Sequence, residues 1–183
     1  PSTYVESESE AETLFVNMQD PVSGLHVEMQ YTVMEAYDAL TRSLKIVNDS
    51  TEPVELLRAL SASVDFPRAD YEWLQLSGAW TRERDVVRRP VAYGMQAVES
   101  RRGASSHQQN PFAALLSPGA DEDHGEVYGF SLVYSGSFIA QAEVDQFRTT
   151  RLSIGINPFD FTWLLEPGAA FQTPEAVMVY SSE

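Results

Sequence analysis

The sequence predicts an all-β protein built as an antiparallel β-sandwich, and three observations support this fold class. Apolar and polar side chains alternate over many short segments, which is the period of a half-buried strand. Turn-forming Gly, Pro, Asn and Asp residues separate most of these segments at regular spacing. Amphipathic segments of helical length do not alternate with them, which argues against a parallel α/β sheet.

A hairpin is expected near the start of the chain. Apolar residues occupy every second position over residues 25–33, and polar residues fill the positions between them. The apolar segment 14–16 comes before this strand, and the turn-forming residues 20–24 lie between the two. The order strand, turn, strand indicates two antiparallel neighbours.

The next segments continue the alternation with interruptions. Leu40, Leu44 and Ile46 share a face that Arg42 interrupts. Over residues 54–66 the even positions are apolar except for one arginine, and good helix formers at 55–60 leave a short helix open. A strand is favoured because the alternation extends beyond the segment that could be helical. Further strands are expected at residues 71–76, 91–98, 113–116, 127–134, 138–147, 151–156 and 176–180.

The composition of the 183 residues restricts the partners. Hydrophobic residues make up 43%, enough for a core, and the length suits a single β-sandwich domain, or a large piece of one, over residues 1–183. The net charge of −15 repels phosphate backbones and anionic lipids, so neither nucleic acid nor a membrane is an expected partner. The absence of cysteine excludes disulfides and zinc–thiolate sites within these residues and favours a cytoplasmic location.

No catalytic or metal-binding motif stands out in the sequence. His26, His107 and His124 are too far apart for a helical two-histidine metal site, so no metal and no cofactor is expected. A nucleophile elbow and a phosphate-binding loop are both absent. The sequence holds 27 carboxylates, too many for the sequence alone to select a catalytic pair.

Two tryptophans contrast with each other. Trp73 alternates with Tyr71 and is expected in the core. Trp80 follows the small residues Ser77, Gly78 and Ala79, and it does not belong to a run of alternating apolar and polar residues. An aromatic side chain held on a loop suits the apolar face of a sugar ring, so Trp80 is a candidate binding residue.

Arginines are concentrated in one short region. Six of the chain's eleven fall within residues 82–102, among them Arg82, Arg84, Arg88 and Arg89. One interpretation is that they pair with nearby carboxylates at 83, 85 and 99, and the other is that they line a subunit or domain interface. His107 lies in the long polar loop 103–112, which either faces water or serves a site.

Several motifs, taken together and in order, resemble one known family. They are QLSGAWTRER at 75–84, RGASSHQQNPF at 102–112, GFSLVYSGSF at 129–138, GINPFDF at 155–161 and FQTPE at 171–175. This series is similar to the N-terminal domain of the bacterial family 36 glycoside hydrolases, the α-galactosidases. The resemblance extends from about residue 4 to the end of the chain.

The resemblance implies an architecture and an activity. Family members carry an N-terminal β-supersandwich, a (β/α)8 catalytic barrel and a C-terminal β-domain, and they release terminal α-galactose from melibiose and raffinose with retention of configuration. Both catalytic aspartates lie in the barrel, so residues 1–183 are expected to be a fragment of the supersandwich, N-terminal to the barrel, without a catalytic residue and inactive alone.

The resemblance also implies partners. The family enzymes form tetramers in which this domain reaches toward a neighbouring subunit's active site, and Trp80 occupies the position expected to contact the galactoside. Arg82, Arg84, Arg88, Arg89 and His107 are candidate interface residues.

Three hypotheses therefore stand. The first is a non-catalytic α-galactosidase domain that supports assembly and completes a neighbour's sugar pocket. The second is a free-standing carbohydrate-binding β-sandwich module, and the third is a structural packing domain without sugar contact.

Overall fold

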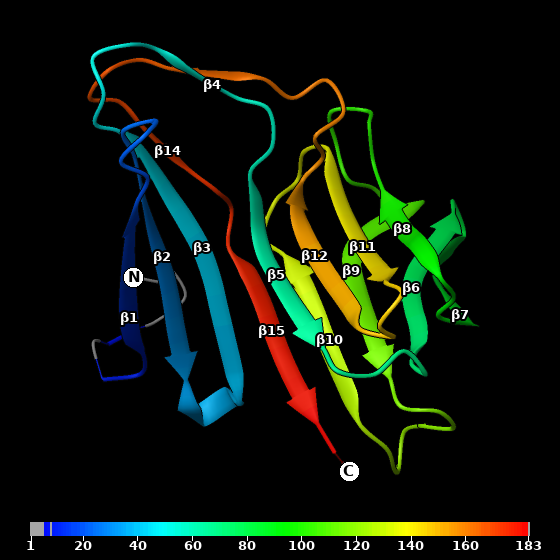
Figure 1. Ribbon diagram of the computed structural model, residues 1–183. Helices are drawn as coiled ribbons and strands as arrows, with labels where there is room; N and C mark the ends of the chain where they lie inside the picture. Colours follow the sequence, from blue (N-terminus) through cyan, green and yellow to red (C-terminus); the bar gives the residue numbers. More distant parts are fainter. Residues whose placement is uncertain (1–5, 8, 183) are drawn as a thin grey trace.

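A computed structural model describes residues 6–7 and 9–182 and confirms the all-β prediction (Figure 1). The helical structure within these residues is one short 3-10 turn, η1 (Glu35–Tyr37), which is far too short to cross a membrane. In chain order the strands are β1 Glu12–Gln19, β2 Leu25–Met34, β3 Ala39–Asn48, β4 Val54–Leu56, β5 Leu60–Phe66, β6 Glu72–Ala79, β7 Arg82–Pro90, β8 Gly94–Glu99, β9 Gln109–Leu116, β10 Val127–Leu132, β11 Phe138–Val144, β12 Thr150–Ile156, β13 Trp163–Leu165, β14 Ala170–Gln172 and β15 Ala176–Ser181.

The strands form one large sheet and two smaller ones, and all strand pairs are antiparallel. The large sheet has nine strands in the order β1-β2-β3-β15-β10-β9-β6-β7, with β14 also paired to β3. A four-stranded sheet, β5-β12-β11-β8, packs in front of its β15–β6 part (Figure 1). The short pair β4–β13 arches over the end of β3. The expected hairpin of β1 and β2 is present in full register.

The main core lies between the large sheet and the four-stranded sheet. Trp73 and Leu115 contribute from the large sheet, Phe138, Leu152 and Ile154 contribute from the facing sheet, and each side chain is fully buried. These residues sit at alternate positions of their strands, so the period of two in the sequence directly selects the buried face. Trp73 was expected in the core, and the indole Nε1 donates a hydrogen bond of 2.9 Å to Gln75 Oε1.

The segment 54–66 is strand, as favoured, but it is divided between two sheets. β4 pairs with β13 and β5 pairs with β12, and residues 57–59 connect them without regular structure. Leu56 packs into a second core with Leu165 and Phe171, whereas Phe66 belongs to the main core. The continuous alternation in the sequence therefore hides a change of packing partner, and the helical alternative for 55–60 is wrong.

The arginine-rich region was not expected to be a strand, yet residues 82–90 form β7. This strand is an edge of the large sheet and pairs only with β6 among the described strands. Most of its side chains are exposed on both faces, so it lacks the apolar alternation that marks a half-buried strand. The edge position explains the charges, because charged side chains discourage further pairing of an edge strand.

Truncation of Trp73 tests the core directly. Trp73→Ala should lower the free energy of unfolding by about 3–5 kcal/mol, because it opens a cavity at a fully buried site and removes one of the two donors to Gln75 Oε1. Trp80→Ala is the matched control, since its side chain is 81% exposed and its loss should cost less than ~0.5 kcal/mol. Urea unfolding followed by circular dichroism measures both, and similar losses for the two variants would contradict this assignment of the core.

Candidate functional site

Trp80 lies at the tip of the hairpin that joins β6 to β7. Ala79 pairs with Arg82, so Trp80 and Thr81 form a two-residue loop between them. Thr81 adopts a positive φ of 70°, a left-handed backbone conformation that few non-glycine residues adopt outside turns. With 81% of its surface exposed, Trp80 matches the prediction of a loop aromatic outside the core.

Gly78 shapes the base of this tip. The pairing register of β6 and β7 shifts between Ser77 and Ala79, which marks a bulge. A Cβ at Gly78 would overlap the backbone oxygen of Arg82 and approach the backbone oxygen of His107 to 3.1 Å. Glycine is therefore needed for the close approach of three backbone segments, and the bulge fixes the direction of the tip.

The loop that carries His107 packs beside this hairpin. Ser106 and Gln109 exchange backbone hydrogen bonds of 3.3 and 3.2 Å, so His107 and Gln108 form a tight turn. Ser77 Oγ donates to Gln109 Oε1 at 3.3 Å, and Asn110 Nδ2 donates to the Leu76 carbonyl at 3.3 Å. The structure thus brings the exposed His107 to the same end of the sandwich as Trp80.

Charges at the hairpin tip are fixed by local hydrogen bonds. The backbone N–H groups of Glu83 itself and of Thr81 hold the pKa of the Glu83 carboxyl below its usual range, with a smaller contribution from His107 and Arg84. The Thr81 N–H donates to Glu83 Oε1 at 2.8 Å. Glu83 is therefore ionised at neutral pH, while Arg82 and Arg84 form none of the ion pairs found among residues 6–7 and 9–182.

Arg88 and Arg89 lie farther along β7 and have partners within the sandwich. Arg88 forms an ion pair with Glu72 and donates to the Ala120 carbonyl at 2.6 Å. Arg89 points to the other face of β7, where its Nη2 donates to Gln75 Oε1 at 3.2 Å. Ion pairs between these arginines and Glu83 or Asp85 were expected, but none is found among the described residues. Strand β6 instead supplies Glu72 to Arg88 and Gln75 to Arg89.

Asn157 forms hydrogen bonds to several segments at this end of the sandwich. It was not among the candidate residues predicted from the sequence. Asn157 is buried, with 2% of its surface exposed. Asn157 Nδ2 donates to Glu99 Oε2 at 2.9 Å and to the carbonyls of Ser100 and Phe138 at 3.2 Å. Its Oδ1 accepts from the Phe159 N–H at 3.0 Å. The only sequence signal was the Asn-Pro turn inside the motif GINPFDF.

Arg101 and Phe159 form a second exposed feature near Asn157. The Arg101 guanidinium pairs with Glu99 at 2.8 Å and lies 4.3 Å from the centre of the Phe159 ring. This confirms the pairing that was expected at Glu99. The loop 133–137 joins the same end, since the Ser135 carbonyl accepts from the Ser105 N–H at 2.8 Å.

The chemistry available at this end is that of binding. Among the described residues, no group of His, Asp and Glu could hold a metal ion. The hollow beside the hairpin is lined by Arg82, Glu83, Arg84, Asp85 and Val86, which gives it a charged wall. The tip therefore presents an exposed indole next to Arg82 and Arg84, which form no ion pair within the part of the chain that the structure describes.

Comparison with known proteins identifies the family of the chain. The chain belongs to the family described as the glycosyl hydrolase family 36 N-terminal domain, whose sequence model matches residues 1–166. It is 63% identical over all 183 residues to α-galactosidase AgaA of Geobacillus stearothermophilus and 42% identical to α-galactosidase 1 of Pediococcus pentosaceus. The chain spans 25% of the length of each of these relatives.

Solved structures show the same fold. The crystal structure of AgaA from Geobacillus stearothermophilus superposes with a TM-score of 0.97 at 63% identity, covering 100% of this chain and 26% of that one. A variant of the same enzyme in complex with stachyose gives the same values. The galactosidase domain of an α-galactosidase–sucrose kinase superposes with a TM-score of 0.93 at 39% identity, covering 96% of this chain and 24% of that one.

Proposed function

We propose that this chain is the non-catalytic N-terminal domain of an α-galactosidase that acts in the cytoplasm. The intact enzyme hydrolyses terminal α-D-galactosides such as melibiose and raffinose in a (β/α)8 barrel that follows this domain. The support is the family membership together with relatives that are α-galactosidases about four times as long as this chain. Catalysis belongs to the barrel, so the domain alone is inactive.

Within the intact enzyme, the Trp80 hairpin completes the galactoside pocket of a neighbouring subunit in a homotetramer. The observation that carries this role is the 81% exposure of Trp80 on a braced hairpin tip. An indole face packs well against the C–H groups of a sugar ring, and galactose presents such a face. Shielding the pocket from water also strengthens the polar contacts that hold the sugar hydroxyls.

A free-standing carbohydrate-binding module is the second candidate. Such a module would need a concave site built by its own residues, with polar groups that converge on the sugar. The hollow at the hairpin has charged walls and does not include Trp80 among its lining residues. The chain by itself therefore supplies one wall of a site, which favours a pocket shared with other parts of the enzyme.

Replacement of Trp80 tests the pocket role in the full-length enzyme. Trp80→Ala should lower kcat/KM for raffinose at least about tenfold, or roughly 1.4 kcal/mol of transition-state stabilisation. Phe147→Ala is the control, because Phe147 is also an exposed aromatic, at 77%, but lies on the turn between β11 and β12. Wild-type kcat/KM in a tetrameric Trp80→Ala variant would contradict the pocket role. Loss of the tetramer together with activity would make Trp80 an assembly anchor.

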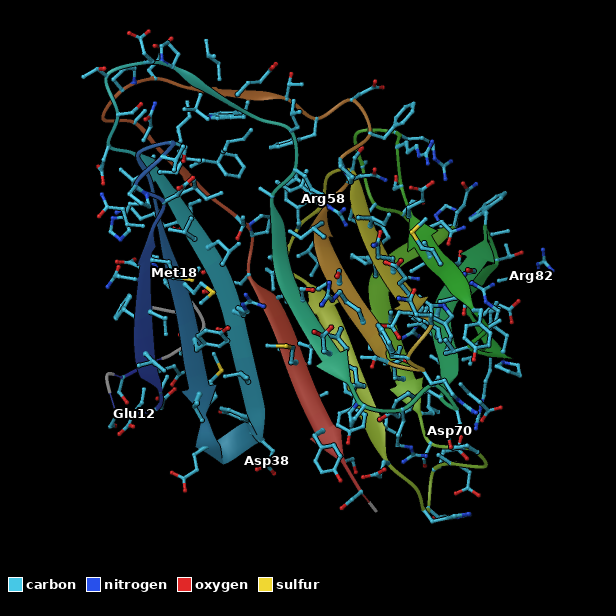
Figure 2. All side chains as sticks on the ribbon, in the orientation of Figure 1. Glu12, Met18, Asp38, Arg58, Asp70 and Arg82 are labelled. Atoms are coloured by element: carbon cyan, nitrogen blue, oxygen red, sulfur yellow. The ribbon has the colours of Figure 1, made fainter. Side chains whose placement is uncertain are left out.

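Charge reversal tests whether the tip docks on a neighbouring subunit. Arg82 and Arg84 are exposed and form no ion pair among the described residues, so carboxylates across an interface would complement them. The double variant Arg82→Glu, Arg84→Glu should lower the mass of the assembly in sedimentation at physiological salt. Arg58→Glu is the control, since Arg58 is exposed in the connection between β4 and β5, away from this tip (Figure 2). A full tetramer in the double variant would refute the interface.

A further inference from the structure

A series of hydrogen-bonded side chains runs along one face of β6, from the main core to the hairpin that carries Trp80. The indole Nε1 of Trp73 donates to Gln75 Oε1 at 2.9 Å, and Gln75 Nε2 donates to Ser77 Oγ at 3.0 Å. Ser77 Oγ in turn donates to Gln109 Oε1 on β9 at 3.3 Å. Alternate residues of a strand share a face, so the three β6 residues form one row. We call these four residues the polar ladder.

The direction of every hydrogen bond in the polar ladder is fixed at its buried end. Gln75 Oε1 accepts from Trp73 and also from Arg89 Nη2 at 3.2 Å. An indole and a guanidinium can donate but cannot accept, so Gln75 must direct its oxygen to them and its amide nitrogen to Ser77. The Ser77 hydroxyl accepts that bond and gives its own proton to Gln109. Each bond therefore supports the next in a single direction.

Burial anchors the polar ladder at the core and connects it to the loop 103–112. Trp73 is fully buried and Gln75 is 7% exposed, whereas Ser77 and Gln109 are half-buried. Ser77 and Gln109 are also cross-strand partners, at the point where the loop enters β9. A buried amide that loses its partner costs free energy, so the ladder resists any change in the spacing of β6 and β9.

The backbone beyond Ser77 needs such an anchor because it is strained. The bulge between β6 and β7 follows directly after Ser77. Arg84 in β7 and Thr81 at the tip adopt left-handed φ angles of 59° and 70°, which are uncommon for residues other than glycine. Strained residues persist where the surrounding structure determines their conformation. The polar ladder and the close packing of the loop 103–112 against Gly78 supply this constraint.

We propose that the polar ladder positions the Trp80 hairpin, with Ser77 and Gln109 as positioning residues that hold the indole in the direction in which it meets the galactoside. This inference rests on the pocket role proposed for Trp80, but the rigidity of the hairpin can be measured without any enzyme activity. Removal of the Ser77 hydroxyl leaves Gln75 Nε2 without an acceptor and Gln109 Oε1 without a donor, which frees the tip to move.

Hydrogen–deuterium exchange of the full-length protein, read by mass spectrometry, measures the rigidity of the hairpin. In Ser77→Ala the amides of residues 77–85 should exchange at least about fivefold faster than in the wild type, because exchange requires a local opening that the polar ladder opposes. Ser77→Thr keeps the hydroxyl and should restore slow exchange. Ser43→Ala is the matched control, since Ser43 also donates to a glutamine at 3.3 Å, but from β3, which β15, β10 and β9 separate from β6.

A double-mutant cycle with Trp80 tests whether Ser77 acts through the indole. Ser77→Ala should lower kcat/KM for raffinose at least about threefold when Trp80 is present, as expected for the loss of a hydrogen bond. In the Trp80→Ala enzyme the same substitution should change kcat/KM less than about 1.5-fold, because no indole remains to be positioned. A general loss of stability would lower activity equally in both enzymes.

The two measurements separate the possible failures. Unchanged exchange at residues 77–85 in Ser77→Ala overturns the inference, whatever Trp80 contributes to activity. Faster exchange with equal kinetic losses in both enzymes also overturns it, because Ser77 then acts independently of Trp80. Wild-type kcat/KM in Trp80→Ala contradicts the proposed pocket role, and faster exchange in Ser77→Ala then still supports the polar ladder as the anchor of the hairpin.

Discussion

Burial of Trp73 and its neighbours between the two main sheets is the constraint on which the rest of the structure depends. Trp73, Phe138, Leu115 and Leu152 are fully buried and hold β6 against the four-stranded sheet. The next core-facing residues on β6 become progressively polar, through Gln75 and Ser77, until the strand leaves the core. The hairpin tip beyond them is therefore anchored at one end and exposed at the other, which is what presentation of a side chain to another molecule requires.

The sequence predicted the features that follow from a single strand's own pattern. Alternation identified the sandwich, placed Trp73 in the core and left Trp80 outside it. It could not show which sheet a strand joins, so the change of partner within residues 54–66 was hidden. Edge strand β7 was not predicted, because a strand that is exposed on both faces does not show the alternation of apolar and polar residues that marks a half-buried strand. The hydrogen bonds of Asn157 could not be predicted from the sequence either, because the partners Glu99, Ser100 and Phe138 come from other strands and loops.

Two surfaces of the domain have opposite chemistry and suggest different partners. The hairpin tip combines an exposed indole with Arg82 and Arg84, which form no ion pair among residues 6–7 and 9–182, and it is the surface that we propose to contact a neighbouring subunit and its sugar. The β1–β3 part of the large sheet carries exposed apolar side chains such as Leu14 and Met18 beside Arg42, which is partly buried.

The central claim is that Trp80 of one subunit serves the active site of another, and subunit mixing tests it most directly. A full-length Trp80→Ala enzyme is co-expressed with an enzyme that is inactivated at its barrel nucleophile but keeps Trp80, and the mixed tetramers are isolated with two different tags. The account predicts that mixed tetramers recover activity well above either parent, because an intact hairpin then meets an intact barrel. Activity no higher than the sum of the two parents, in tetramers of confirmed mixed composition, would contradict it.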